Sequence, residues 1–272
     1  MSAQIRASAA LVAAIVLAAL LGPVLWTADP LLTDLPVRFA GLGAAHPLGT
    51  DQFGRDLLAR VLQGARLSLA GSAVVLAGCC GIGLLVGGLA GLVGGRLDRA
   101  VGRLVDALLA LPSLVVALAV VGAVGRSFAH LVAALVVTGW PWYARVFRSL
   151  VIAERHEGYV LAAVSTGCRL RRIALVHVLP NILGTSVVVA AANLGGALLG
   201  LTSLSFLGLG VQPPEPEWGA MITDSRAYFQ THPWTMIVPG VAIGLTVLSV
   251  NLLGDALRDL ADQRTGVARR EV

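Results

Sequence analysis

Residues 67–93 read LSLAGSAVVLAGCCGIGLLVGGLAGLV, and none of these side chains is charged. A helix of about 20 mostly apolar residues crosses the hydrocarbon core of a bilayer, and it satisfies its own backbone polar groups there. The stretch therefore predicts a membrane-spanning helix. The whole chain has the same character: 57% of its 272 residues are hydrophobic, 13% are charged and the mean hydropathy is +0.83, which excludes a soluble domain of ordinary composition.

Five further apolar stretches bring the predicted number of transmembrane helices to six, so the sequence predicts an all-α membrane protein. The first stretch follows Arg6 and is either a span or a secretory signal peptide, although its apolar run exceeds the roughly 7 to 15 residues of a signal peptide. The five stretches cover residues 7–26, 107–124, 130–147, 182–209 and 234–253.

The positions of the basic residues predict how the chain is oriented. All 20 are arginines, and positively charged residues accumulate in short cytoplasmic loops. With the N-terminus inside, 14 arginines lie on the cytoplasmic side and six outside, and the net charge is +6 inside and −1 outside. Both termini are therefore predicted to be cytoplasmic. The arginines lie between apolar runs instead of forming one basic face, so we expect membrane lipid and no nucleic acid as a partner.

Two connections are too long to be simple turns, and long ordered connections are usually functional. The external one, residues 27–66, ends in an amphipathic segment that predicts a helix lying on the membrane surface. Its apolar face carries Leu57, Leu58, Val61, Leu62 and Ala65, and its polar face carries Arg55, Asp56, Arg60, Gln63 and Arg66. The internal connection, about 154–181, is too polar to be a span.

These features predict three parts in the chain. Residues 1–66 form an N-terminal span with its external segment, residues 67–255 form a core of five spans that includes the internal loop, and residues 256–272 form a cytoplasmic tail.

Small and polar residues inside the predicted spans have two interpretations. Four glycines that recur every four residues predict a ridge for close helix packing, or alternatively a gap that opens a translocation path. They are Gly83, Gly87, Gly91 and Gly95. Four polar residues of the fifth predicted span either bond to neighbouring helices or line such a path. They are Asn193, Thr202, Ser203 and Ser205.

The sequence contains no motif for catalysis or for a metal. The five histidines have no HxxxH or HExxH spacing, and no serine lies in a GxSxG elbow. Cys79, Cys80 and Cys168 lack metal-ligand and CxxC spacing. A GxxxxGK[ST] phosphate loop is impossible because the chain has no lysine. The chain is therefore predicted not to be an enzyme and to hold no cofactor, so that any ATP and magnesium belong to another polypeptide.

The internal connection resembles the EAA loop of bacterial ABC-importer permeases. That pattern is E-A-A, three residues, G, nine residues, I, one residue, L-P, and Leu161 and His177 replace its glutamate and isoleucine. We expect a short helix, a glycine turn and a second helix, with the proline starting the next span. The resemblance implies that this loop docks on an ATPase. The residues assigned to the coupling are Tyr159, Ala162, Ala163, Gly167, Arg169, Arg171, Arg172, Leu179 and Pro180.

Three further stretches resemble the C-type permeases of dipeptide, oligopeptide and nickel importers. The first is HPLGTDQFGRD at 46–56 with GARLS at 64–68, the second is 171–181, and the third is SFLGLGV at 205–211, followed by Pro213-Pro214 and Trp218-Gly219. In the first stretch the family motif falls on Gly49, Thr50, Asp51, Gly54, Arg55 and Asp56.

The resemblance implies a type I (MetI-like) importer permease in the cytoplasmic (inner) membrane that supplies half of a translocation pathway. Such a permease pairs with a homologous B-type subunit, docks two cytoplasmic ATP-binding subunits and receives substrate from an extracytoplasmic binding protein. Similar permeases carry peptides or nickel, and the scattered histidines favour peptides. A stand-alone secondary transporter or channel predicts buried titratable groups or an inverted repeat, neither of which we find in the sequence. A membrane scaffold would support no ATP-dependent uptake.

Overall fold

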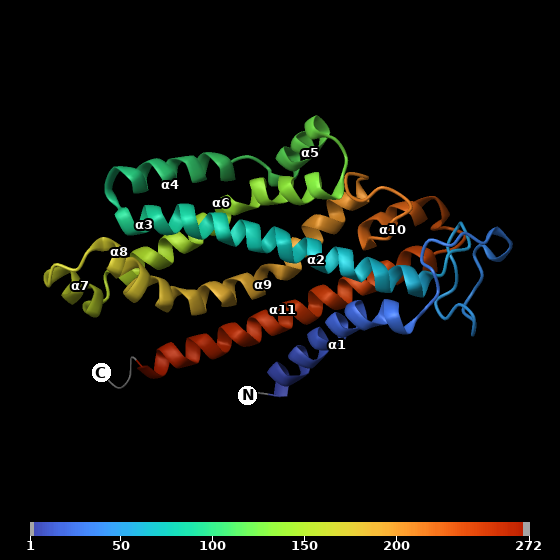
Figure 1. The fold of residues 1–272 in the computed structure, drawn as a ribbon, viewed down its shortest axis with the longest axis horizontal. Coiled ribbons are helices and arrows are strands. Elements are labelled where there is room, and N and C mark those ends of the chain that lie inside the picture. Colours follow the sequence, from blue (N-terminus) through green and yellow to red (C-terminus); the bar gives the residue numbers. More distant parts are fainter. Residues whose placement is uncertain (1–2, 269–272) are drawn as a thin grey trace.

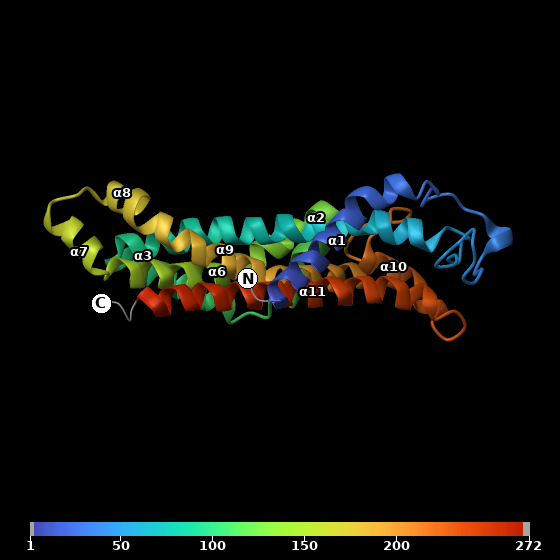
Figure 2. The ribbon, with the colours of Figure 1, turned by 90° about the horizontal axis from the view of Figure 1, so that it is seen from below.

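The computed structural model describes residues 3–268, and every named element in this part of the chain is helical. The elements form an elongated bundle, with the loop of residues 26–56 and α10 at one end and α7 and α8 at the other (Figure 1; Figure 2). Residues 269–272 of the predicted tail lie outside the described residues. The long helices are α1 (Ala3–Leu25), α2 (Leu57–Gly83), α4 (Gly95–Leu109), α5 (Ser113–Val124), α6 (Phe128–Arg155), α9 (Leu179–Phe206) and α11 (Trp234–Ala268). The short ones are η1 (Leu35–Val37), η2 (Leu84–Gly88), α3 (Leu89–Val93), α7 (Gly158–Ser165), α8 (Leu170–Arg172), η3 (Ile173–Val178), α10 (Trp218–Ser225) and η4 (Arg226–Tyr228).

Several helices are long and apolar enough to cross a membrane, so the prediction of a multi-span all-α protein is confirmed. A further crossing results if α4 and α5 count together as one broken span. The 28-residue α6 is about 42 Å long, which is long enough to cross a membrane. Its polar and aromatic residues make it less apolar than the helices that qualify, so the number of six spans remains a prediction. The four lengths that qualify singly are Ile5–Leu25, Leu57–Val93, Leu170–Phe206 and Trp234–Leu260.

The predicted third span, 107–124, is not one continuous helix. The chain bends by 83° between α4, which ends at Leu109, and α5, which begins at Ser113. Pro112 causes the break, because it has no N–H to donate and disfavours helical backbone at the residue before it. Pro112 itself is extended (φ −60°, ψ 113°) and stands at the N-cap of α5.

The prediction of a separate surface helix at 57–66 is wrong. These residues form the first turns of α2, which continues through η2 and α3 as a single helical length to Val93. Arg60 on the polar face is only 2% exposed, and Ala65 on the apolar face is 5% exposed. The amphipathic pattern therefore arises because the polar face meets other parts of the protein and not water.

The predicted start of the fifth span at Pro180 is also wrong. Helix begins at Leu170 and runs without a break to Phe206, so Pro180 lies inside it. Proline cannot donate to the carbonyl four residues earlier, and its ring clashes with that carbonyl. The preceding segment, η3, is π-helical, and this wider turn accommodates the proline without ending the helix.

Three of the four glycines in the predicted ridge face α6 closely. A Cβ atom built on Gly83 would lie 2.6 Å from Tyr143 Cβ, and one on Gly87 would lie 2.0 Å from the carbonyl oxygen of Ala144. A Cβ on Gly91 would lie 2.9 Å from the carbonyl oxygen of Arg148. The backbones of α2–α3 and α6 therefore approach each other as only glycine permits.

Gly95 does not belong to this ridge, because a Cβ there would meet nothing within 4 Å. Instead Gly94 (φ 74°) and Gly95 (φ 64°) form the turn that joins α3 to α4. A left-handed backbone favours glycine at both positions. The four-residue periodicity ends one glycine earlier than we predicted.

Arg66 of α2 compensates for a proline in α1. Pro23 lacks an N–H, so the carbonyl of Ala19, four residues earlier, has no helical donor. The Nε–H of Arg66 donates to this oxygen at 2.9 Å, and its Nη2 donates to the carbonyl of Leu20 at 2.6 Å. An unsatisfied carbonyl is costly in lipid, so this contact holds α1 against α2.

We expect Arg66→Leu to lower the free energy of unfolding by about 1.5–3 kcal/mol, the usual range for a hydrogen bond to a charged group. In a Pro23→Ala background, residue 23 regains its N–H and the same substitution should cost less. Denaturant unfolding of the full chain in detergent micelles, as a double-mutant cycle, measures the difference. Equal costs in the two backgrounds would contradict the assignment.

Candidate functional site

The external motif, residues 49–56, folds as a tight loop whose glycines have left-handed backbones. Gly49 has φ 77° and Gly54 has φ 75°. A Cβ on Gly54 would lie 1.7 Å from the carbonyl oxygen of Asp34, so no other residue fits there. The hydroxyl of Thr50 donates to the carbonyl of Val37 at 2.5 Å and accepts from the N–H of Ala40 at 2.8 Å. These bonds fix the loop against the preceding segment.

Two acids and two arginines form a buried charge cluster at the start of α2. The Nε of Arg55 lies 2.6 Å from Asp51 Oδ2, and the Nε of Arg60 lies 3.4 Å from the same oxygen. Asp224 of α10 is a looser partner, 3.9 Å from Arg55 Nη2 and 4.0 Å from Arg60 Nη2. Burial raises the pKa of Asp224 above its usual range, while the two arginines oppose that rise. Asp51 is therefore the main counter-charge of both arginines.

Asp56 joins three segments at the beginning of α2. One carboxylate oxygen accepts from the N–H of Ala59 at 2.7 Å, which is an N-cap, and from Trp26 Nε1 at 3.1 Å. The other oxygen lies 2.8 Å from His46 Nδ1. Asp56 is 4% exposed. The last residues of the α1 connection and the external loop are thus both tied to one helix terminus.

Glu217 is a further buried acid, which the sequence analysis missed. It is the N-cap of α10 and accepts from the N–H groups of Gly219 and Ala220, both at 3.0 Å. The hydroxyl of Ser68 in α2 donates to it at 2.9 Å, and Glu217 is 0% exposed. The sequence analysis noted Trp218-Gly219 but predicted no helix there, so the negative charge of Glu217 directly before a helix N-terminus was not recognised as a cap.

The internal loop lies at the opposite end of the bundle and contains α7 (Figure 1). Val160 is 1% exposed and packs in an apolar cluster with Val151 of α6 and Ile173 of η3. Gly167 (φ 76°) makes the turn after α7, as the glycine of the pattern predicts. One side of α7 is therefore anchored on the ends of two long helices.

A polar network adds a second anchor. The hydroxyl of Tyr159 donates to the carboxylate of Glu154, and Asn181 Nδ2 lies 3.1 Å from the same carboxylate and 2.5 Å from the tyrosine oxygen. Asn181 Nδ2 also lies 2.9 Å from the carbonyl oxygen of His177. Partial burial raises the pKa of Tyr159, and the bond to Glu154 adds to this while Asn181 opposes it. The network connects α6, α7 and α9.

The other side of α7 and the turn that follows are uncovered. Leu161, at the position of the pattern's glutamate, is 49% exposed, and Val164 is 55% exposed. Among the remaining assigned residues, Ala163 and Leu179 are half-buried and the rest are exposed; these are Tyr159, Ala162, Gly167, Arg169, Arg171, Arg172 and Pro180. The described chain contains no ion pair that involves the three arginines. The surface combines apolar side chains with unpaired positive charge.

The family model described as "Binding-protein-dependent transport system inner membrane component" matches residues 83–267, which include η2, α6, α7 and α9. The chain belongs to this family of permeases. Its relatives are subunits of ABC transporters, so the permease is a multi-pass protein of the cytoplasmic membrane and works with ATPase and other permease subunits. Nothing in its described residues indicates catalysis.

Individual relatives match most of this permease. The dipeptide transport system permease protein DppC of Alkalihalophilus pseudofirmus is 39% identical over 93% of the chain and 84% of its own length. The dipeptide permease DppC of Escherichia coli is 42% identical, over 87% and 78%. The nickel transport system permease protein NikC of Escherichia coli is 38% identical, over 86% and 84%. The resemblance to C-type dipeptide and nickel permeases is confirmed.

We expect Asp51→Asn to destabilise the permease by about 3–5 kcal/mol, because it leaves two buried guanidinium groups without their main counter-charge. Asp224→Asn is the matched control, and at longer distances and greater exposure it should cost about 1 kcal/mol or less. Unfolding of the purified chain in micelles compares the two. Equal losses would show that Asp51 is not the dominant partner.

Proposed function

We propose that this permease forms half of the translocation pathway of an ATP-driven peptide importer and that α7 docks on an ATPase subunit. The observation that carries the proposal is that α7 is anchored on one side and uncovered on the other. Leu161 and Val164 present apolar surface beside the exposed arginines of 169–172. A short amphipathic helix of this kind can seat in a groove of a partner.

Apolar contact takes the role that the pattern's glutamate would have had. With Leu161 in that place, docking rests on shape, on burial of leucine and valine, and on the positive charge of Arg169 and Arg172. Burying one such apolar side chain contributes about 1.5–3 kcal/mol. The ATPase surface opposite α7 should therefore be apolar at its centre and acidic at its rim.

The contacts that anchor α7 can transmit a displacement of α7 to α6 and α9. Val160 packs against α6 and η3, and the Glu154–Tyr159–Asn181 network joins the same helices. A push on α7 during ATP-driven closure of the ATPase pair would thus displace the ends of α6 and α9 together. Rocking of these helices alternates access to the pathway.

The wider assembly follows the sequence predictions. We infer six spans with α6 and the broken α4–α5 pair as two of them, and both termini in the cytoplasm, because arginine density is greatest at the α7 end. The partners are a homologous B-type permease, two ATP-binding subunits that hold ATP and magnesium, and an extracytoplasmic substrate-binding protein. The external loop around 49–56 faces the binding protein.

Peptides are the proposed substrate, and nickel is the alternative. Relatives at 39% and 38% identity are named for dipeptide and for nickel transport, so similarity does not decide between them. In the described part of the chain no group of three or more His, Cys, Asp or Glu side chains can hold a metal ion. This favours a peptide, for which small polar groups suffice.

Single cysteines at Ser165 or Thr166 should crosslink to an ATPase subunit in the assembled complex, because both residues are exposed at the end of α7. The native Cys79, Cys80 and Cys168 are first replaced by alanine. Val160→Cys, which is buried on the anchored side, is the matched control and should not crosslink. Failure at every exposed position of the loop, in a complex that still assembles, would contradict docking through α7.

Deletion of this chain should abolish ATP-dependent uptake of di- and oligopeptides while leaving nickel uptake unchanged. Uptake of a defined peptide panel and of radioactive nickel is measured in the same cells, with restored wild-type chain as control. Loss of nickel uptake alone would assign the permease to nickel. Uptake in vesicles that lack the ATPase subunits would contradict an ATP-driven importer.

A further inference from the structure

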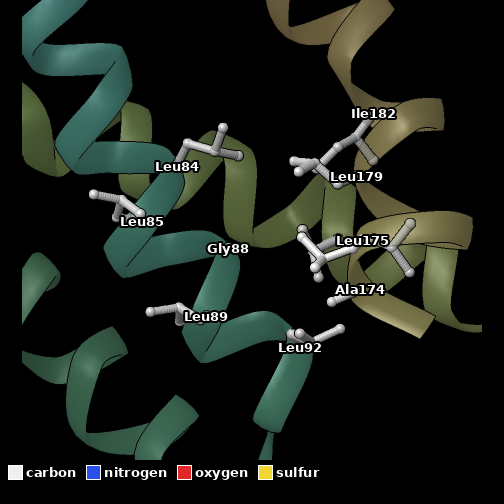
Figure 3. Close-up of a pocket in the computed structure, with 11 residues that line it drawn as sticks. Leu84, Leu85, Gly88, Leu89, Leu92, Ala174, Leu175, Leu179 and Ile182 are labelled. Carbon is white, nitrogen blue, oxygen red and sulfur yellow. The ribbon is translucent and has the colours of Figure 1, made fainter. Parts of the chain in front are cut away.

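An apolar groove of about 220 Å³ lies between the two helical lengths that lead to α7. Leu84 and Leu92 on one helix and Leu175 and Leu179 on the other point toward one another across it (Figure 3). Val151 of α6 forms part of its wall. All of its lining residues are aliphatic or glycine, so the groove suits a hydrocarbon chain and offers no hydrogen bond to a polar ligand.

Each wall of this groove contains a π-helical segment. One wall contains η2 and the other contains η3. Single π-turns within α-helices occur frequently at functional sites. The groove therefore lies between two irregular segments, one of which continues from the coupling loop.

The groove lies just inside the cytoplasmic boundary of the hydrocarbon core. On one wall, no charged residue occurs from Leu67 to Gly95. On the other wall, His177 is the single titratable residue from Ile173 to Gln212. Both apolar stretches end in arginines at the α7 end of the bundle (Figure 1). Two of its lining residues, Leu85 and Leu89, are 64% and 54% exposed, as expected of side chains that face lipid.

Positive charge stands at the cytoplasmic end of both walls. Arg171 lies one helical turn before Leu175 on one wall, and it is exposed. Arg155 donates from Nη1 to the carbonyl of Gly91 at 2.7 Å, which places it on the other wall next to Leu92. Neither arginine takes part in an ion pair within residues 5–260, whose side chains the structure describes.

We propose that the groove binds an anionic phospholipid of the cytoplasmic leaflet, with an acyl chain between η2 and η3 and the phosphate at Arg155 and Arg171. The charge complementarity and the position next to lipid single out this occupant. Basic pockets between membrane helices on the cytoplasmic side bind anionic headgroups in this way. The inference rests on the cytoplasmic placement of α7 in the proposed function.

The test uses the full transporter complex in vesicles of phosphatidylcholine with one quarter phosphatidylglycerol. The probe is phosphatidylglycerol with a photoreactive acyl chain, and phosphatidylcholine with the same chain is the uncharged comparison. Mass spectrometry then identifies the labelled peptides. We expect labelling within 84–92 and 174–182, about fivefold stronger with the anionic probe for each arginine that contacts it.

Two kinds of variant separate the chain from the headgroup. Ala174→Phe, or Gly88→Val on the opposite wall, fills the groove and should abolish labelling by both probes; an added Cβ on Gly88 meets only ordinary contacts, 3.6 Å from Leu84 Cδ1. Arg171→Gln or Arg155→Gln should lower labelling by the anionic probe about fivefold and leave the uncharged probe unchanged. Val137→Phe, at an exposed site on α6, is the control and should change neither.

Equal labelling by the two probes, or labelling insensitive to both arginine variants, would overturn the anionic site. So would crosslinks from the groove to the partner permease in place of lipid. Photolabelling does not depend on transport activity. The amount of ATPase subunit that copurifies with the permease is measured in a separate experiment. A complex that binds the lipid but fails to couple would count against the proposed function and not against the groove.

Discussion

A proline in a membrane helix leaves one backbone carbonyl without its donor, and the permease meets this constraint in different ways at Pro23, Pro112 and Pro180. At Pro23 the helix stays continuous because Arg66 of α2 donates to the free carbonyl of Ala19. At Pro112 the helix ends, and the chain bends by 83°. At Pro180 the helix continues through the π-helical η3. The bond from Arg66 meets the requirement that no polar group of the backbone is left unpaired in lipid.

Each solution also has a structural consequence. The bond from Arg66 fixes α1 to α2. The bend at Pro112 allows α4 and α5, which run in different directions, both to pack on α6. The third extends a membrane helix to Leu170, so that it begins directly at the turn after α7. The span helix thus begins at Leu170, directly after the Gly167 turn that follows the end of α7 at Ser165.

The sequence predicted the class of structure well and the helix boundaries less well. Apolar runs of about 20 residues identify spans because lipid demands them, and four of the six predicted spans coincide with single helical lengths that qualify. The first turns of α2 were mistaken for a surface helix because Arg60 and Arg66 look solvent-exposed in sequence. Their partners, Asp51 and the α1 carbonyls, are distant along the chain or lie in the backbone, and periodicity carries no such information.

The candidate site was predictable where local conformation dictates a residue type. Gly167 and Gly54 adopt left-handed backbones, and a spacing pattern captures such positions. Glu217 was missed, since its role depends on Ser68, 149 residues away in the chain. The groove between η2 and η3 was also beyond reach, because it exists only where two separate helices carry π-turns side by side.

The two ends of the bundle differ in how they resist deformation. At the end that carries the 49–56 loop, Asp51, Arg60 and Glu217 are nearly or fully buried, and separating them from their partners would expose charge to an apolar interior, which is costly. At the α7 end, the Glu154–Tyr159–Asn181 bonds are exposed and exchange readily with water. The open groove and its π-turns add room for movement there. A displacement of α7 is therefore taken up first by η2 and η3. At the opposite end of the bundle, the buried charged residues keep α2 and α10 together.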